Sequence, residues 1–252
     1  MTAGVLDGSI RQLGDRVRQW LGPPPSYGPD TADLRTFSVG GLELPVRATV
    51  AVLLVVVAIC LDWSRTFIPQ PILDLGRAAP AMRYQATERL LLFGALPLLV
   101  LLAAFRDRPG RYGLGLGAWR IGLPVALAGI GVMSPIILAL AARPEFAAYY
   151  APSHAPVGDV LFTSLLDLPA SEFLIRGFLM FALLRVVGPV AVVLVTLPFV
   201  FSHLGKPEIE LLSTFFGGLA YGWLDWRTGS IWWSAATHVV LVTLLVSAVP
   251  AG

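Results

Sequence analysis

The stretch LDLPASEFLIRGF, residues 166–178, decides the fold because it places charged residues inside a long apolar run. These charged residues are Asp167, Glu172 and Arg176. A charge at the centre of a bilayer costs about 2.5–3.5 kcal/mol on insertion scales, so charges at this depth indicate function. Glu172 and Arg176 are four residues apart, and one helical turn therefore brings the carboxylate next to the guanidinium.

The whole chain has the composition of a membrane protein. Hydrophobic residues make up 56% of the 252 residues and charged residues 13%, and the mean hydropathy is +0.74. A soluble domain carries about 25% charged residues. We therefore expect an all-α fold, a polytopic transmembrane helical bundle. The net charge of +2 and the position of the arginines beside apolar runs argue against a nucleic-acid partner. Cys60 is the single cysteine, which excludes an internal disulfide.

Two parts are expected along the chain. Residues 1–45 predict an N-terminal amphipathic helix, over 1–22, followed by an irregular Pro/Gly-rich segment. This helix lies on the membrane surface or packs on the protein itself, and the pattern favours neither. Residues 46–252 predict the transmembrane helical domain, with about seven spans. The apolar runs are 46–62, 84–105, 121–142, 157–187, 189–203, 207–226 and 231–249.

Several runs carry further signals. The fourth run is too long for a perpendicular helix through about 30 Å of hydrocarbon, and Pro169 is expected to bend it. Gly218 and Gly222 form a small-xxx-small face that favours close contact with another helix. Glu88 and Arg89, at the start of the second run, are interpreted as charges at the membrane interface.

The arginines predict the orientation. The side that holds the N-terminal segment and the loop 106–120 is the richer in arginine, so the N-terminus is expected in the cytoplasm. Frequent alanine, arginine and proline suggest a high-GC bacterium. We therefore predict an integral protein of a bacterial cytoplasmic membrane. Its expected partners are membrane lipids and a membrane peptide or protein, and membership of a larger membrane complex is left open.

Two histidines, His203 and His238, also lie in apolar runs. A buried carboxylate such as Glu172 and one histidine can together hold and deprotonate a water molecule. A second histidine can donate to the oxyanion of a tetrahedral intermediate, and Arg176 can keep Glu172 ionised. This set predicts a hydrolytic site without a nucleophilic serine or cysteine. The alternative is a group of paired polar residues that lock helix packing, and spacing alone does not separate the two.

A metal site is the other alternative. Glu172 with His203 and His238 matches the ligand count of a catalytic zinc site. The chain has no HExxH motif, however, and these candidates come from three separate runs. We expect a metal-free site with no cofactor and keep zinc as the weaker alternative.

The second half of the chain resembles the CPBP family of membrane proteins, which includes CAAX prenyl endopeptidases and bacteriocin-processing proteins. The family's first motif, EExxxR followed by Gly, corresponds to SEFLIRG at residues 171–177. Its second motif, FxxxH, corresponds to Phe199 through His203, and the third, HxxxN/D, begins at His238. The similarity extends from about residue 159 to the C-terminus, and the family-like core is about 157–250.

The resemblance implies a glutamate-dependent intramembrane endopeptidase that hydrolyses a membrane-associated peptide. It implies that Glu172 and His203 activate water, that Arg176 orients the glutamate and that His238 stabilises the oxyanion. Two positions depart from the family pattern. Ser171 replaces the first glutamate, and Val242 stands where the third motif has Asn or Asp.

These departures leave enzymatic activity open. Losing a general base costs about 10²–10⁴-fold, and losing one oxyanion donor costs about 10²–10³-fold. The rival interpretation is a catalytically degenerate member that acts as a membrane scaffold, assembly factor or partner-binding subunit. A small transporter is disfavoured because the sequence shows no inverted repeat.

Four further residues are candidate auxiliaries. Asp167 lies four residues before Ser171, so both face the same side of a helix, and Asp167 is a candidate to supply the missing carboxylate. Its favoured alternative is a role in helix packing or at the surface. Lys206 and Glu210 belong to a segment HLGKPEIE that resembles HxGKPxxE of one family branch. Their alternative is a charged turn at the membrane surface.

Overall fold

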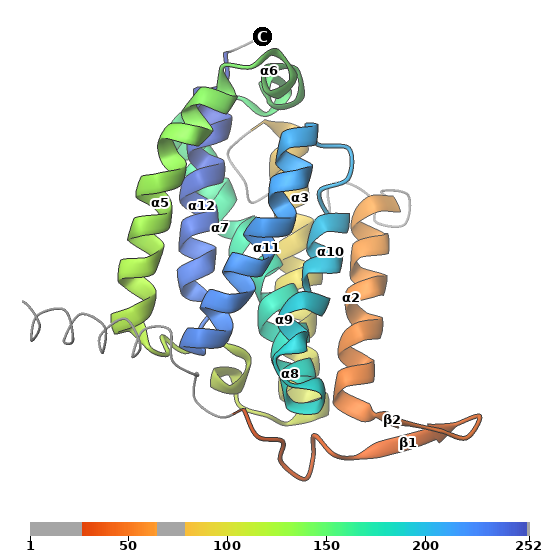
Figure 1. The fold of residues 1–252 in the computed structure, drawn as a ribbon. Coiled ribbons are helices and arrows are strands. Elements are labelled where there is room, and N and C mark those ends of the chain that lie inside the picture. Colours follow the sequence, from red (N-terminus) through yellow and green to blue (C-terminus); the bar gives the residue numbers. More distant parts are fainter. Residues whose placement is uncertain (1–26, 65–78, 251–252) are drawn as a thin grey trace, which may run out of the picture.

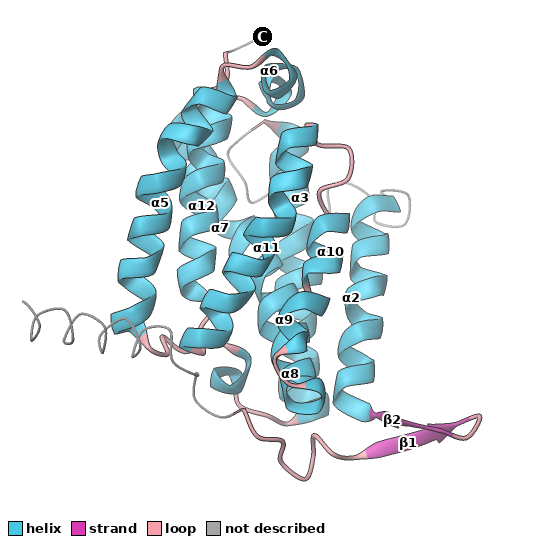
Figure 2. Ribbon diagram, viewed as in Figure 1, coloured by secondary structure: helices cyan, strands magenta, loops and turns pink. Residues whose placement is uncertain are grey.

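The computed structural model describes residues 27–64 and 79–250, which form a bundle of helices with one small β-hairpin (Figures 1 and 2). The amphipathic helix expected over residues 1–22 lies outside the described residues. The all-α fold expected from composition is confirmed.

Three helical segments are long and apolar enough to cross a membrane by length and composition: residues Val46–Ser64, Met82–Phe105 and Trp119–Ala141. They correspond to the first three predicted runs. The first is α2 (Val46–Ser64) and the third is α5 (Trp119–Ala141). The second is built from α3 (Pro80–Arg89), η1 (Leu90–Ala95), α4 (Leu96–Leu99) and η2 (Val100–Phe105).

Helices also occupy the other four predicted runs. They are α7 (Val157–Glu172) with η5 (Phe173–Met180) and α8 (Phe181–Val187), then α9 (Val190–Leu194) with α10 (Thr196–Phe201), then α11 (Glu208–Thr228) and α12 (Trp232–Ala248). Short helices connect the long ones: η3 (Pro109–Tyr112), α6 (Pro144–Tyr150) and η4 (Ala151–Ser153). The number of seven spans stays a prediction, because these four helical segments do not meet the length and apolarity of a span on their own.

The fourth helical segment changes its winding at one place. α7 continues through Pro169, and the π-helical segment η5 begins directly after Glu172. A π-helix has wider turns than an α-helix, and such segments occur frequently at functional sites. Every residue of η5, including Arg176, is buried. The sequence signal at Pro169 therefore lies one turn before the place where the winding changes.

A β-hairpin precedes α2. Strands β1 (Thr36–Val39) and β2 (Leu42–Pro45) pair antiparallel, and the turn between them is Gly40–Gly41. Both glycines have positive φ, +58° and +83°, as a two-residue hairpin turn of type I′ requires. This differs from the irregular structure expected up to residue 45. The Gly-Gly pair between two short runs of alternating residues is the local signal for it.

Close helix contacts in the second half depend on glycine, as the small-xxx-small spacing predicts. A Cβ at Gly218 would lie 2.9 Å from Cγ2 of Thr196, and one at Gly222 would lie 3.1 Å from Cγ1 of Val192. These contacts pack α11 directly against α9 and α10.

Gly122 permits another close contact, between α5 and α12. A Cβ there would overlap the indole ring of Trp233, whose Nε1 donates to the Leu116 carbonyl over 3.1 Å. Gly131 lies on the same helix, and a Cβ there would meet nothing within 4 Å.

We predict that Gly122→Ala lowers stability by about 1–3 kcal/mol, because the indole must move and lose its hydrogen bond. The matched variant Gly131→Ala is expected to unfold at an unchanged or slightly higher temperature. Thermal unfolding in detergent measures both. Equal midpoints for the two variants would contradict the contact.

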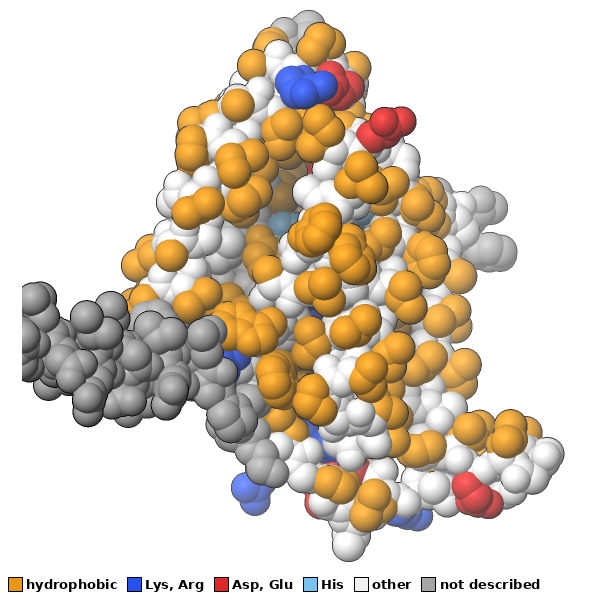
Figure 3. All heavy atoms as spheres, in the orientation of Figure 1, with side chains coloured by type: hydrophobic (Ala, Val, Ile, Leu, Met, Phe, Trp, Pro, Cys, Tyr) orange, Lys and Arg blue, Asp and Glu red, His pale blue; other side chains and the backbone are white. Residues whose placement is uncertain are grey.

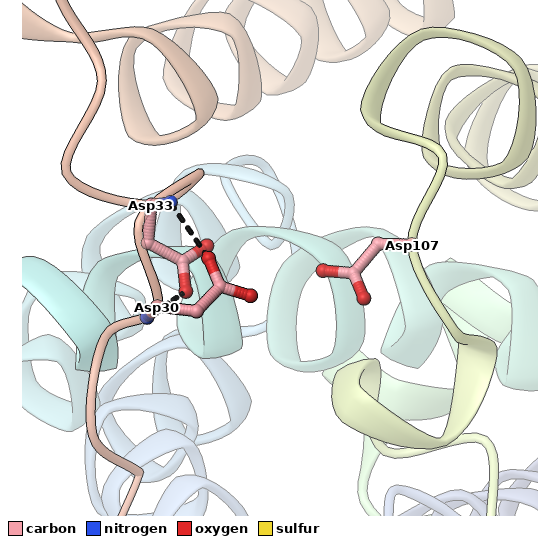
Figure 4. Close-up of side chains that lie close together, drawn as sticks. All are labelled: Asp30, Asp33 and Asp107. Atoms are coloured by element: carbon pink, nitrogen blue, oxygen red, sulfur yellow. Dashed lines mark hydrogen bonds between the residues drawn. The ribbon is translucent and has the colours of Figure 1, made fainter.

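An ion-pair network closes the end of the bundle that carries the hairpin. Arg47 Nη1 lies 2.7 Å from Asp33 Oδ1 and 3.0 Å from Asp107 Oδ2. Arg111 lies 2.7 Å from Asp33 and 2.9 Å from Asp107, and it also pairs with Asp30. Figure 4 shows the three carboxylates turned toward one another, with reciprocal backbone hydrogen bonds between Asp30 and Asp33. The network ties the segment before the hairpin to the loop after η2.

Asp30 makes this network sensitive to acid. Burial disfavours the charged form, but the backbone N–H of Asp33 and the Arg111 guanidinium outweigh it and lower the pKa of Asp30 from 3.8 to about 2. A carboxyl whose pKa is lower in the folded state stabilises the fold above the unfolded pKa and loses that contribution as the pH falls.

We therefore expect Asp30→Asn to unfold at a lower temperature than the natural protein at pH 7. The difference should be constant above pH 5, should shrink below about pH 4 and should disappear near pH 2. Unfolding scans across this range check it. A difference that grows on acidification would contradict the prediction.

Candidate functional site

A cavity of about 530 Å³ lies in the half of the bundle away from the hairpin. Side chains from α2, α3, α6, α7, α10 and α12 line it, together with the loop after α10. Its polar lining residues are Asp62, Gln85, Arg89, Tyr149, Tyr150, Ser153, Asp167, Ser171, Ser202, His203, Lys206 and His238. Figure 3 shows a hollow in the upper half of the molecule with histidine surface inside it.

Glu172 forms the centre of a buried charged group behind this cavity. Its Oε1 lies 2.7 Å from Nδ1 of His238, and its Oε2 pairs with Arg176 one turn along the helix. The guanidinium of Arg176 lies over the rings of Phe199, at 4.1 Å, and Tyr221, at 5.3 Å. Glu172 and Arg176 are each 1% exposed, so each charge needs the other.

The structure places Glu172 differently from the role that the resemblance implies. Among the described residues that line the cavity, His238 is present and Glu172 is absent. Because the carboxylate can only accept, Nδ1 of His238 carries a proton and Nε2 is the atom left for another partner. Glu172 therefore holds His238, as a carboxylate holds the imidazole in a catalytic dyad.

The Nδ1 atom of His203 is held by other groups than the carboxylate that holds His238. Its Nδ1 lies 2.8 Å from the Phe199 carbonyl oxygen and 3.1 Å from Oγ of Ser202. A carbonyl only accepts, so Nδ1 donates and Nε2 of the neutral ring can accept a proton. The rings of His203 and His238 pack on Phe199, with centroids 4.7 and 6.0 Å away. The structure thus brings both predicted histidines to one cavity and to one aromatic ring.

Asp167 is the acidic side chain of α7 that reaches the cavity. Ser171 Oγ donates to Asp167 Oδ1 over 3.0 Å, which confirms that both face one side of the helix. Arg89 Nη1 lies 3.3 Å from Asp167 Oδ2, and its Nη2 lies 2.8 Å from Asp62 Oδ2. Arg89 therefore lies between two carboxylates of the cavity wall, and its depth at the membrane interface stays a prediction.

Lys206 and Glu210 meet at the rim of the cavity. Lys206 Nζ lies 2.6 Å from Glu210 Oε1 and 3.1 Å from the hydroxyl of Tyr150, which donates to Glu210 over 2.7 Å. Burial, and then the charge of Glu210, raises the pKa of the Tyr150 phenol, so it remains a donor at neutral pH. The charged turn thereby connects α6 to the start of α11.

The two positions that depart from the family pattern, Ser171 and Val242, both line the cavity. Val242 lines the cavity one turn after His238 and presents an apolar side chain there. Ser171 also lines the cavity and holds Asp167. A carboxylate is therefore present next to the position where the first glutamate is missing, whereas Val242 itself offers no hydrogen-bond donor.

Sequence reasoning missed several residues of this region. Asp62 and Tyr150 line the cavity. Asp225 is fully buried on α11 and accepts from Oγ of Ser234 over 2.8 Å, and Tyr221 lies one turn before it under Arg176. Asp225 carries the same signal as Glu172, a charge within an apolar run, and that signal could have found it.

Metal-ligating geometry occurs elsewhere in the described part of the chain. Among the described residues, the group of three acidic or histidine side chains whose ligand atoms all lie within 4.8 Å of one another consists of Asp30, Asp33 and Asp107 (Figure 4). Arg47 and Arg111 already pair with these carboxylates, so the group is an ion-pair network. The set contains neither Glu172 nor either site histidine, and the choice between a metal-free site and a zinc site stays a prediction.

Comparison with known proteins bears on the same half of the molecule. Residues 153–244 match the family model described as Rce1-like, type II CAAX prenyl endopeptidase Rce1-like. Over these residues the chain is similar to this family. The match includes Glu172, Arg176, His203 and His238, and it confirms the CPBP resemblance. No curated protein and no solved structure matched the chain. The matched region excludes α2 and α3, which supply Asp62 and Arg89 to the cavity.

We predict that Glu172→Ala destabilises the protein by about 3–5 kcal/mol, because it leaves the buried Arg176 charge without its carboxylate. Glu145→Ala is the control: it removes an exposed ion pair, with Arg143, and should leave the unfolding temperature unchanged. Thermal unfolding in detergent compares the two variants. A small effect of Glu172→Ala would show that water reaches Arg176.

Proposed function

We propose that the protein is an intramembrane endopeptidase that hydrolyses a membrane-associated peptide in this cavity. One observation carries the proposal: two histidines and the carboxylate of Asp167 line the same cavity. The family match over residues 153–244 supports a CAAX-protease-like function. The assignment of roles to individual residues is part of the proposal.

In this proposal, Asp167 and His203 activate the water molecule. The Ser171 hydroxyl holds the Asp167 carboxylate, and Arg89 compensates its charge. Nε2 of His203 is available to take a proton from water. Asp167 thus takes the part that the resemblance gives to the first glutamate of the motif. Glu172 acts through another residue, by orienting His238.

In the same proposal, His238 stabilises the oxyanion. Water adds to the scissile carbonyl, and its proton passes to the Asp167–His203 pair. A protonated His238, held by Glu172, donates from Nε2 to the resulting oxyanion. The proton then returns from His203 to the leaving amine as the C–N bond breaks. Because Val242 cannot donate, we expect a rate about 10²–10³-fold below that of a site with a second donor.

A second function has a specific observation in its favour. The apolar Val242 in the cavity wall suits a site that binds a membrane segment without cleaving it. The same cavity then holds a partner peptide, and the protein serves as a scaffold or assembly subunit.

The test uses purified protein in proteoliposomes with fluorogenic membrane peptides, with and without a prenylated cysteine. We expect slow cleavage of one peptide class, and a loss of about 10²–10⁴-fold in Asp167→Asn and in His203→Ala. Ser153→Ala, which also changes a residue of the cavity lining, is the control and should retain the rate.

A rescue variant separates catalysis from packing. Adding Ser171→Glu to Asp167→Asn returns a carboxylate to the cavity one turn away, and we expect it to recover part of the activity. In the natural background, Val242→Asn should raise the rate. Absence of cleavage in every variant, with a membrane protein that co-purifies with the natural chain, would establish the partner-binding function instead.

A further inference from the structure

The β-hairpin of residues 36–45 stands apart from the bundle. It extends sideways from the base of α2, across the direction of the long helices (Figure 1). α2 begins at Val46, directly after β2 ends at Pro45. The hairpin therefore lies at the end of a helix that is long and apolar enough to span a membrane.

The hairpin has two chemically different faces. The register pairs Phe37 with Leu44 and Val39 with Leu42, and side chains directly opposite each other share a face. These four residues form one apolar face. The other face is polar, where Ser38 is paired with Glu43, and Glu43 accepts from the Thr36 hydroxyl over 2.6 Å.

The apolar face has no cover among the described residues. Phe37, Val39 and Leu42 are 39%, 55% and 67% exposed. Figure 3 shows hydrophobic side chains on the upper side of the hairpin, toward the apolar belt of the bundle, and an acidic side chain on its lower side. An isolated two-stranded hairpin is marginally stable in water, so this face needs a partner.

Lipid fits this face better than protein does. The helix that follows, α2, also exposes apolar side chains suited to lipid, those of Val52, Leu53, Val56 and Val57. Exposed arginines lie at the same end of the chain's fold, in the segments next to the hairpin and after η2. They are Arg35, Arg106 and Arg108. Arginines beside an apolar surface suit the anionic headgroups of a membrane.

We propose that residues 36–45 are an interfacial membrane anchor, whose apolar face enters the boundary between headgroups and acyl chains. The polar face with Ser38 and Glu43 then points to water. At its other end, α2 contributes Ile59, Asp62 and Trp63 to the cavity wall. The anchor thereby fixes the depth of α2, and with it the depth of this wall. The anchor does not depend on peptidase activity.

The test places an environment-sensitive fluorophore on single cysteines at adjacent positions. Cys60 is the one cysteine of the chain and is exposed, so Cys60→Ala provides the background. Val39→Cys and Leu42→Cys report on the apolar face, and Ser38→Cys is the matched control on the polar face. The labelled proteins are reconstituted in vesicles of phosphatidylcholine and phosphatidylglycerol. Nitroxide lipids and aqueous iodide serve as the two quenchers.

We expect nitroxide lipids to quench positions 39 and 42 several-fold more than position 38, and iodide to show the reverse order. Equal quenching at positions 38 and 39 by iodide would place the hairpin in water and overturn the anchor. Protection of position 39 from both quenchers, increasing with the protein-to-lipid ratio, would assign the face to a second copy of the chain and overturn it as well. Unfolding temperatures equal to that of the background protein confirm that the labelled variants are folded.

Discussion

The pairing of Glu172 with Arg176 is the constraint on which the rest of the site depends. Both side chains are almost entirely removed from water, and neither charge is tolerable there alone. Their pairing fixes the carboxylate so that its second oxygen faces His238 on α12. The rings of Phe199 on α10 and Tyr221 on α11 flank the guanidinium. One buried charge pair thus brings together four helical segments of the family-matched half.

The cavity wall combines the family-matched region, residues 153–244, with the part of the chain that precedes it. Asp167 and Ser171 come from α7, whereas Arg89 and Asp62 come from the second and first membrane helices. The match to the family begins at residue 153, so these two partners lie outside it. The N-terminal helices therefore do more than enclose the family core, because they supply the cation that compensates the Asp167 carboxylate.

The sequence was sufficient to predict much of this arrangement. Apolar runs predicted the helical segments, because each run is long compared with the turns between them. The candidate site residues could be picked out as the charges and histidines within those runs, since a polar residue in hydrocarbon costs free energy. They are Glu172, Arg176, His203 and His238. Spacing by one turn predicted that Asp167 and Ser171 share a face.

Other features required coordinates. Arg89 and Asp167 are 78 positions apart, and no local pattern connects them. A charge near the end of an apolar run looks the same whether it faces headgroups or a cavity, so the sequence did not connect Arg89 with the cavity. The division of roles between Glu172 and Asp167 depends on which side of α7 meets the cavity. By contrast, the hairpin did have a local signal in Gly40–Gly41, which the surrounding irregular composition concealed.

The π-helical segment η5 has a consequence for the whole length of its helix. A π-helix rotates less per residue than an α-helix. The eight residues of η5 therefore rotate the chain about the helix axis by roughly 100° less than eight α-helical residues would, a difference of about one residue. Before it, α7 presents Asp167 to the cavity; after it, α8 presents Arg185 to the Arg111 carbonyl and to Asp33 at the opposite end of the bundle. With unbroken α-helical winding over the same residues, α8 would be rotated by about this angle relative to α7, and one of the two side chains would leave its partners. Deleting one residue within 173–180 together with a return to α-helical winding would therefore keep both polar clusters on their partners, whereas α-helical winding without the deletion would turn one of them away.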